Sequence, residues 1–130
     1  MEAKHDIEHL EDIKKLIDSF YLKVRSDEVL GYIFNEVAHV DWNHHLPRMY
    51  AFWEFLLLGG ESYQGNPIEP HIKLNQKIEL KKEFFDRWLL LFKETVDENF
   101  TGKTAEEAKN KAMLIALTWV PKFEHIKRDI

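Results

Sequence analysis

The chain has 130 residues, of which 45% are hydrophobic, 13% aromatic and 32% charged, and its formal net charge is −5. This length fits one domain with a sizeable core, and the acidic balance argues against a nucleic-acid-binding protein, which needs a basic surface. The chain contains no cysteine, so disulfides and iron–sulfur clusters are excluded and a transition metal would need histidine or carboxylate ligands.

The first half of the chain has helical periodicity. Apolar residues recur at steps of three and four from Ile7 to Val24, which predicts an amphipathic helix. After a break at residues 26–27, Gly31 and Asn35 indicate turns around a short element. A second long helix is expected to begin near Asp41 and to end at residue 58, before the Gly-Gly pair at residues 59–60. Pro47 lies inside it and predicts either a later start or a kink.

The second half contains a long irregular segment followed by two helices. Residues 59–78 are rich in glycine and proline, and a loop of this length is often functional. A helix is expected over residues 79–99. The last helix is expected to begin with a capping box at Thr104–Glu107, to bury a row of alanines and to end at Pro121. The chain is therefore predicted to be all-α, with four main helices.

We expect a cytoplasmic protein that does not enter membranes. No apolar stretch approaches the roughly 20 residues of a transmembrane helix. The first six residues are mostly charged or polar and lack the apolar core of a signal peptide.

His71 is the first candidate functional residue. It directly follows Pro70 and has the apolar neighbours Ile68, Ile72 and Leu74. A rigid imidazole between apolar walls is the setting that a haem ligand requires. A histidine that caps or packs a loop shows the same pattern, and the residues alone leave both interpretations open.

Tyr21 and Trp88 are further candidates, since each falls on the predicted apolar face of a helix. Burial would remove a hydroxyl and an indole N–H from water, so each needs a hydrogen-bond partner. That partner is either a backbone carbonyl or a ligand in a pocket, and the pattern does not distinguish the two.

A cluster of histidines suggests an alternative metal site. His39, His44 and His45 precede or begin the second long helix and could form a three-histidine zinc site. Their spacing lacks the one-turn pairing of H-x-x-x-H, which weakens this interpretation.

Four ordered blocks make the sequence similar to the group III truncated haemoglobins. The blocks lie at residues 20–27 with 30–35, 45–53 with 56–59, 63–67, and 84–92. The resemblance extends from Phe20 to about Trp119. Pro47 belongs to the second block, so it does not count against the match.

The resemblance implies an all-α truncated globin, a two-over-two helical sandwich around a haem b pocket, with residues 1–130 as a single globin domain. It makes His71 the proximal ligand of the haem iron. It also implies that Tyr21 and Trp88 donate hydrogen bonds to the bound ligand and that His45 contacts or gates it. The residues expected to line the cofactor are Phe34, Met49, Phe52, Trp53, Phe85 and Trp88.

The implied function is reversible binding of dioxygen and other diatomic ligands such as nitric oxide, in nitric oxide detoxification or oxygen handling. Turnover of nitric oxide or peroxide would require a separate reductase, because the chain has no flavin or nicotinamide domain. The residues alone also leave open a helical domain that binds a protein partner without haem.

Overall fold

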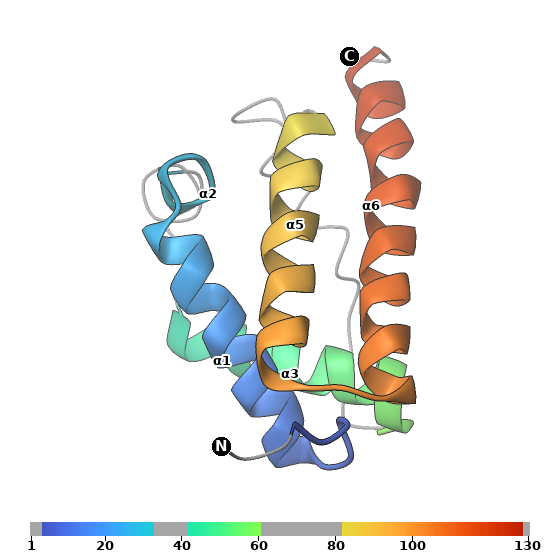
Figure 1. Cartoon of the computed structure of the whole chain (residues 1–130). Coiled ribbons are helices and arrows are strands. Elements are labelled where there is room, and N and C mark those ends of the chain that lie inside the picture. The colour runs from blue at the N-terminus through green and yellow to red at the C-terminus, as the bar shows by residue number, and fades with distance from the viewer. Residues whose placement is uncertain (1–3, 33–41, 61–81, 129–130) are drawn as a thin grey trace.

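The computed structural model describes residues 4–32, 42–60 and 82–128, and every regular element in these ranges is a helix (Figure 1). The helices are α1 (Leu10–Ser26), α2 (Glu28–Tyr32), α3 (Trp42–Leu58), α5 (Lys82–Asn99) and α6 (Lys103–Arg128). The predicted all-α fold is confirmed. No helix in the described ranges is long and apolar enough to cross a membrane. His71, Phe34 and His39 lie outside the described residues.

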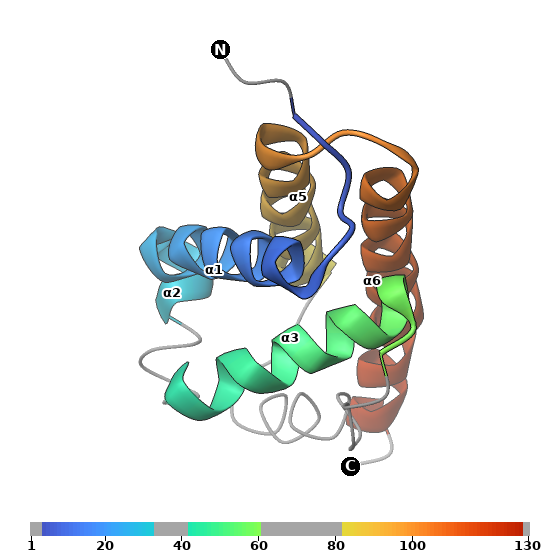
Figure 2. The ribbon, with the colours of Figure 1, turned by 90° about the horizontal axis from the view of Figure 1, so that it is seen from below.

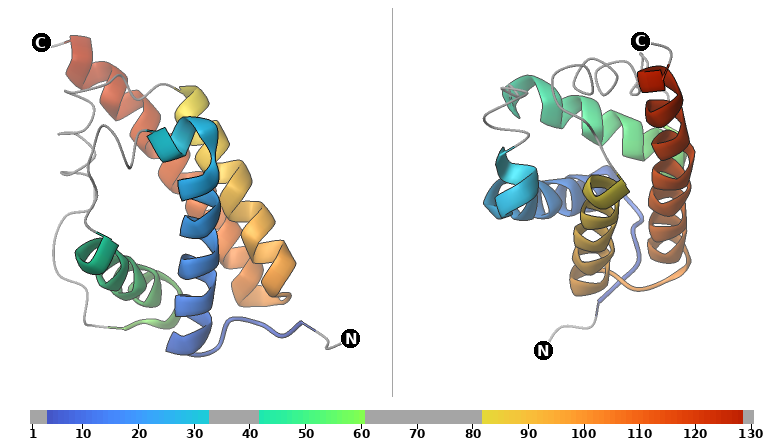
Figure 3. Two further views of the ribbon diagram at one scale, coloured as in Figure 1. Left: turned by 90° about the vertical axis from the view of Figure 1, so that its left-hand side faces the viewer. Right: turned by 90° about the horizontal axis from the view of Figure 1, so that it is seen from above.

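The long helices form two pairs. α5 and α6 run side by side, and α1 and α3 form the second pair across them (Figures 1 and 2). α1 contacts both α3 and α5, and α3 also contacts α6. Figure 3 shows α1 between α3 on one side and the α5–α6 pair on the other. α1 is therefore the central element, and its two faces position side chains against different helices.

α1 forms because its apolar residues lie on one face and its first turn is capped. The Asp12 carboxylate accepts the backbone N–H of His9 at 3.1 Å and completes a capping box. Ile7 was predicted to lie within this helix, and that prediction is wrong. It precedes the helix because His9 is extended, but its side chain is still buried in the core.

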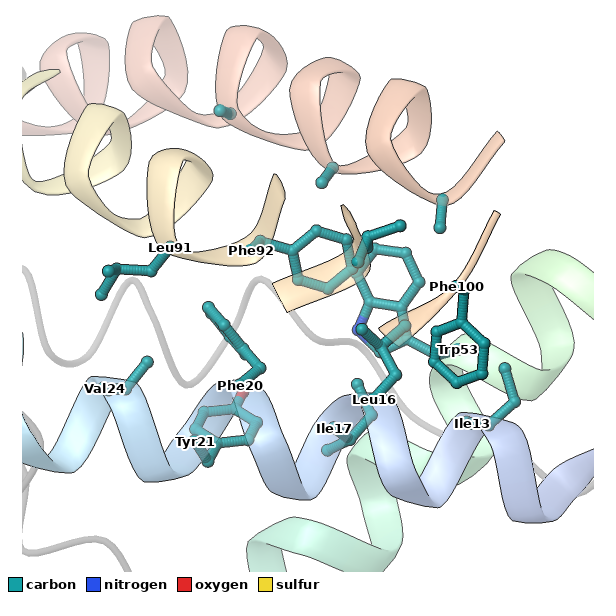
Figure 4. Close-up of a cluster of buried hydrophobic side chains, with 14 of the residues drawn as sticks. Ile13, Leu16, Ile17, Phe20, Tyr21, Val24, Trp53, Leu91, Phe92 and Phe100 are labelled. Carbon is teal, nitrogen blue, oxygen red and sulfur yellow. The ribbon is translucent and has the colours of Figure 1, made fainter. Parts of the chain in front are cut away.

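Aromatic rings dominate the core. The Phe92 ring of α5 stacks on Trp53 of α3 with a centroid separation of 4.7 Å, and it meets Phe20 of α1 edge-on at 5.2 Å (Figure 4). These contacts join three helices at one point. The other buried core residues of the long helices are Ile13, Leu16, Ile17, Tyr21, Val24, Phe84, Phe85, Leu91, Val96, Ala105, Ala108, Ala112 and Ala116.

Two of the four prolines, Pro47 and Pro121, lie inside described helices. α3 begins at Trp42, contains Pro47 and ends at Leu58, followed by Gly59 at a φ of 76°. The predicted end of α3 at residue 58 is therefore confirmed. The prediction that Pro121 ends the last helix is wrong, since α6 extends to Arg128. A proline removes one backbone hydrogen bond and leaves the bonds on either side, so a long helix can continue through it.

The start of α6 is capped by a residue distant in sequence. The Asp6 carboxylate accepts the backbone N–H groups of Thr104 at 2.9 Å and Ala105 at 2.8 Å. The helix begins at Lys103, so the predicted capping box starting at Thr104 is wrong. The predicted row of alanines is buried, and α6 packs closely against α5. The N-terminal segment is thereby tied to the α5–α6 pair.

An ion pair fixes the start of α5 against α1 and α2. Asp27 follows α1 directly, and its carboxylate accepts the backbone N–H of Leu30 at 3.1 Å. The same carboxylate lies 2.7 Å from Nε and 2.6 Å from Nη2 of Arg87. This contact holds the first half of α5 next to the end of α1.

Candidate functional site

Tyr21 and His45 form a hydrogen-bonded pair between α1 and α3. The Tyr21 hydroxyl lies 3.1 Å from Nε2 of His45, and their rings meet edge-on with centroids 5.2 Å apart. Tyr21 is on the buried face of α1, and only 7% of its surface is exposed. A buried hydroxyl needs a hydrogen-bond partner, and the imidazole provides one. The sequence left the partner of the Tyr21 hydroxyl undetermined. The structure shows that the His45 imidazole, which can donate or accept a hydrogen bond, is such a partner.

Burial keeps the Tyr21 phenol neutral. Desolvation raises the pKa of Tyr21 well above the ordinary value of 10.0. A neutral phenol retains its proton at physiological pH, so Tyr21 is a hydrogen-bond donor there.

Trp88 of α5 is connected to this pair through Phe20. Its indole stacks against Phe92 at 5.8 Å with planes inclined by 15°, and it meets Phe20 edge-on at 5.9 Å. The Phe20 ring is in turn 5.0 Å from the Tyr21 ring. The structure therefore brings Tyr21, His45 and Trp88 to one aromatic cluster, with each residue on a different long helix.

Trp42 also belongs to this cluster, although it was not among the predicted site residues. Its ring centroid lies 5.3 Å from that of Tyr21 and 5.7 Å from that of His45. The signal that could have identified it is spacing. Trp42 precedes His45 by three residues, so both side chains fall on one face of α3.

The other predicted lining residues have different environments. Met49 and Phe52 are half-buried and pack against the core. Trp53 and Phe85 are almost fully buried, at 3% exposure each. Phe85 packs edge-on against Phe84 and is a core residue in this structure.

Two of the three histidines of the zinc alternative, His44 and His45, lie in the described residues and have different surroundings. His44 is exposed, and His45 is bonded to Tyr21. Within the described part of the chain, no group of three histidine, aspartate or glutamate side chains is placed to hold a metal ion.

Comparison with known proteins agrees with the fold. Residues 6–120 match the model of the family described as bacterial-like globin. The group 3 truncated hemoglobin ctb of Campylobacter jejuni is 35% identical over 109 residues, which cover 82% of this chain and 84% of that protein. The crystal structure of the group III truncated hemoglobin from Campylobacter jejuni superposes with a TM-score of 0.80 at 31% identity, covering 93% of this chain and 95% of that one.

The fold and these matches define a small haem-binding globin. The chain belongs to the bacterial-like globin family, and the resemblance to group III truncated haemoglobins that its four sequence blocks indicated is confirmed. Haem binding and oxygen binding follow from that family membership.

Proposed function

We propose that residues 1–130 form a single globin domain that binds haem b through His71. The protein reversibly holds dioxygen and other diatomic ligands, including nitric oxide, on the side of the haem that faces Tyr21 and His45. When bound, haem supplies the iron at which such a ligand attaches. The side chains around the ligand decide how long it stays bound.

The observation that carries the proposal is the hydrogen bond between the buried Tyr21 and the half-buried His45, among aromatic rings. Two polar side chains that face each other inside such a cluster are the donor set suited to a small, partly anionic ligand. The aromatic rings of Trp42, Phe20 and Trp88 exclude water, which strengthens a hydrogen bond from this pair.

The direction of the Tyr21–His45 bond decides what Tyr21 can do. When His45 carries its proton on Nε2, the imidazole donates to the phenol oxygen, and the Tyr21 O–H can donate to a ligand. When the proton is on Nδ1, the Tyr21 O–H donates to Nε2 and a ligand has to compete for it. A bound ligand that accepts a hydrogen bond therefore favours the first tautomer, and the pair acts as one donor unit.

The composition supports haem b and histidine ligation. The chain has no cysteine, so it cannot hold haem through thioether bonds or by a thiolate ligand. His71 follows a proline and lies among apolar residues, which favours a fixed and neutral imidazole.

The test is the visible spectrum of the purified protein after addition of haemin. An intense Soret band is expected for the wild type and for His44→Ala, whose side chain is exposed, and the band is lost in His71→Ala. The pyridine haemochromogen spectrum should be that of haem b. A colourless protein that takes up no haemin, or a His71→Ala variant with the wild-type spectrum, contradicts the proposal.

Nitric oxide handling is tested with the same material. We propose that the oxygenated protein converts nitric oxide to nitrate and that a separate reductase returns the haem to the ferrous state. Mixing with one equivalent of nitric oxide should give about one equivalent of nitrate, because each haem binds one ligand. If no nitrate forms, the protein binds dioxygen but does not convert nitric oxide to nitrate.

A further inference from the structure

Two side chains next to the Tyr21–His45 pair form a second contact between α1 and α3. The guanidinium carbon of Arg25 lies 4.1 Å from the centroid of the Trp42 ring. Trp42 meets the rings of both Tyr21 and His45, with planes inclined by 60° and 80°. Trp42 therefore touches both members of the pair, and Arg25 packs against Trp42 from α1.

The spacing of these residues explains why the contacts occur together. Arg25 follows Tyr21 by four residues on α1, and His45 follows Trp42 by three on α3. Residues at these spacings share one helix face. The two helices thus meet through a hydrogen bond and, one turn away, through a cation lying against an aromatic ring.

Exposure shows on which side of the pair this second contact lies. Tyr21 is buried, Trp42 and His45 are half-buried, and Arg25 is exposed. The Arg25–Trp42 contact is therefore on the solvent side of the Tyr21–His45 pair.

A single hydrogen bond does not fix an imidazole. It restrains one ring nitrogen, while the plane of the ring can still rotate about that contact. A second ring packed nearly perpendicular to it restrains the plane. An arginine side chain stacks well on an indole, so Arg25 holds Trp42 in place.

We propose that Trp42, held by Arg25, is a positioning residue that keeps His45 against Tyr21 and thereby slows the escape of a bound diatomic ligand. This inference rests on the proposed function for its effect on ligand escape. The placement of His45 itself does not depend on haem and is tested separately.

The kinetic test compares variants of the haem-loaded protein. Trp42→Leu should release dioxygen about two- to tenfold faster, the range that loss of one aromatic contact corresponds to. Arg25→Met, which keeps the aliphatic part of the side chain and removes the cation, should show a smaller increase. Arg25→Lys and Trp42→Phe, which retain a cation and a ring, should lie nearer the wild type.

Lys15→Met provides the matched control. Lys15 also lies on α1 with its ammonium against an aromatic ring, 5.7 Å from the Phe100 centroid. It is ten residues from Arg25 and contacts neither Trp42 nor His45. Removing this cation should leave dioxygen release unchanged.

The second readout is the reactivity of His45 toward diethylpyrocarbonate, measured by peptide mass spectrometry as a ratio to the adjacent, exposed His44. The ratio should be low in the wild type and in Lys15→Met, and should rise in Trp42→Leu and Arg25→Met. It can be measured whether or not haem is bound.

The outcomes separate this inference from the proposed function. A protein that takes up no haemin overturns the proposed function, while the reactivity ratio still tests whether Trp42 positions His45. A Trp42→Leu or Arg25→Met variant that keeps its Soret band, with unchanged dioxygen release and an unchanged ratio, overturns this inference. Arg25 is exposed, so Arg25→Met retains the buried face of α1 if Trp42→Leu fails to fold.

Discussion

Tyr21 is buried beside an imidazole, and its protonation state controls both hydrogen bonding and stability. The folded pKa of its phenol is raised by desolvation above the ordinary value of 10.0. Below pH 10 the phenol is protonated in both the folded and the unfolded chain, so it adds no pH dependence. Above pH 10 the unfolded chain releases this proton first, and the folded state loses stability.

Tyr21→Phe should therefore reduce the loss of stability in alkali. Between about pH 9 and pH 11, the free energy of unfolding should fall by about 1 kcal/mol less in the variant than in the wild type. Each titrating group changes this free energy by at most ~1.4 kcal/mol per pH unit. Urea unfolding at the two pH values measures it. An equal alkaline loss in the variant would show that the Tyr21 pKa is not raised.

Tyr50 adds an effect of the same sign. Burial and the hydrogen bond to Asp18 raise the pKa of Tyr50 to about 12. Part of the alkaline loss will therefore persist in Tyr21→Phe, and the comparison concerns the difference between the two proteins.

At the scale of elements, the contact between Asp6 and the start of α6 ties the N-terminal segment to the rest of the fold. Burial alone would raise the pKa of Asp6, but the backbone N–H groups of Thr104, Ala105 and Ile7 stabilise the carboxylate and hold its pKa below 3.8. Gly102 adjoins the cap at a φ of 137°, and a Cβ there would lie 2.5 Å from Cγ of Asp6. A side chain at position 102 would therefore collide with the Asp6 carboxylate.

Asp6→Asn should lower the free energy of unfolding at pH 7 by about 1 kcal/mol, or roughly 3 to 5 °C in Tm, because both carboxylate oxygens accept backbone N–H groups and an amide has only one acceptor oxygen. Because the folded pKa is lowered, this contribution is present above pH 3.8 and is lost as the pH falls through the folded pKa. The difference in Tm between wild type and variant should therefore shrink in strong acid.

Asp97→Asn is the control for this experiment. It removes an exposed ion pair with Lys109 near the same turn and should change Tm little. A Tm difference between wild type and Asp6→Asn that is absent at pH 7, or that does not shrink in acid, would contradict the capping role.

The helices show which features the sequence could predict. The periodicity of α1, the Gly59 stop and the alanine face of α6 are local patterns, and each is found where it was expected. The helix starts and stops that depend on distant residues were missed. Asp6 caps α6 from the other end of the chain, which no window around Thr104 can show.

The residues of the candidate site were partly predicted, but the contacts between them were not. Tyr21 and Trp88 were singled out because they lie on apolar helix faces, and the family resemblance added His45. Tyr21 forms a hydrogen bond with His45, and Trp42 contacts both residues. These contacts depend on how α1 crosses α3, which follows from packing of the whole core. The roles of all these residues toward haem and its ligand are proposals, and His71 and Phe34 also lie outside the described residues.

At the scale of the whole molecule, haem acts as a ligand that binds only the folded chain. Such a ligand stabilises the fold by mass action, by about 4 kcal/mol when its free concentration is a thousand times its Kd. Removal of haem should therefore lower Tm substantially, and reloading should restore it. Scanning calorimetry measures both, and equal Tm values with and without haem would contradict the proposed site within the helical core.

The most direct test of the central claim, that Tyr21 and His45 hold the ligand as one unit, is a double-mutant cycle on dioxygen dissociation measured by stopped flow. Tyr21→Phe should accelerate dissociation by about tenfold or more, since a charge-assisted hydrogen bond contributes ~1.5–3 kcal/mol. His45→Leu should accelerate it less, and the double variant should match Tyr21→Phe, because His45 acts through the Tyr21 hydroxyl. An unchanged rate in Tyr21→Phe, or effects that multiply independently in the double variant, would contradict the account.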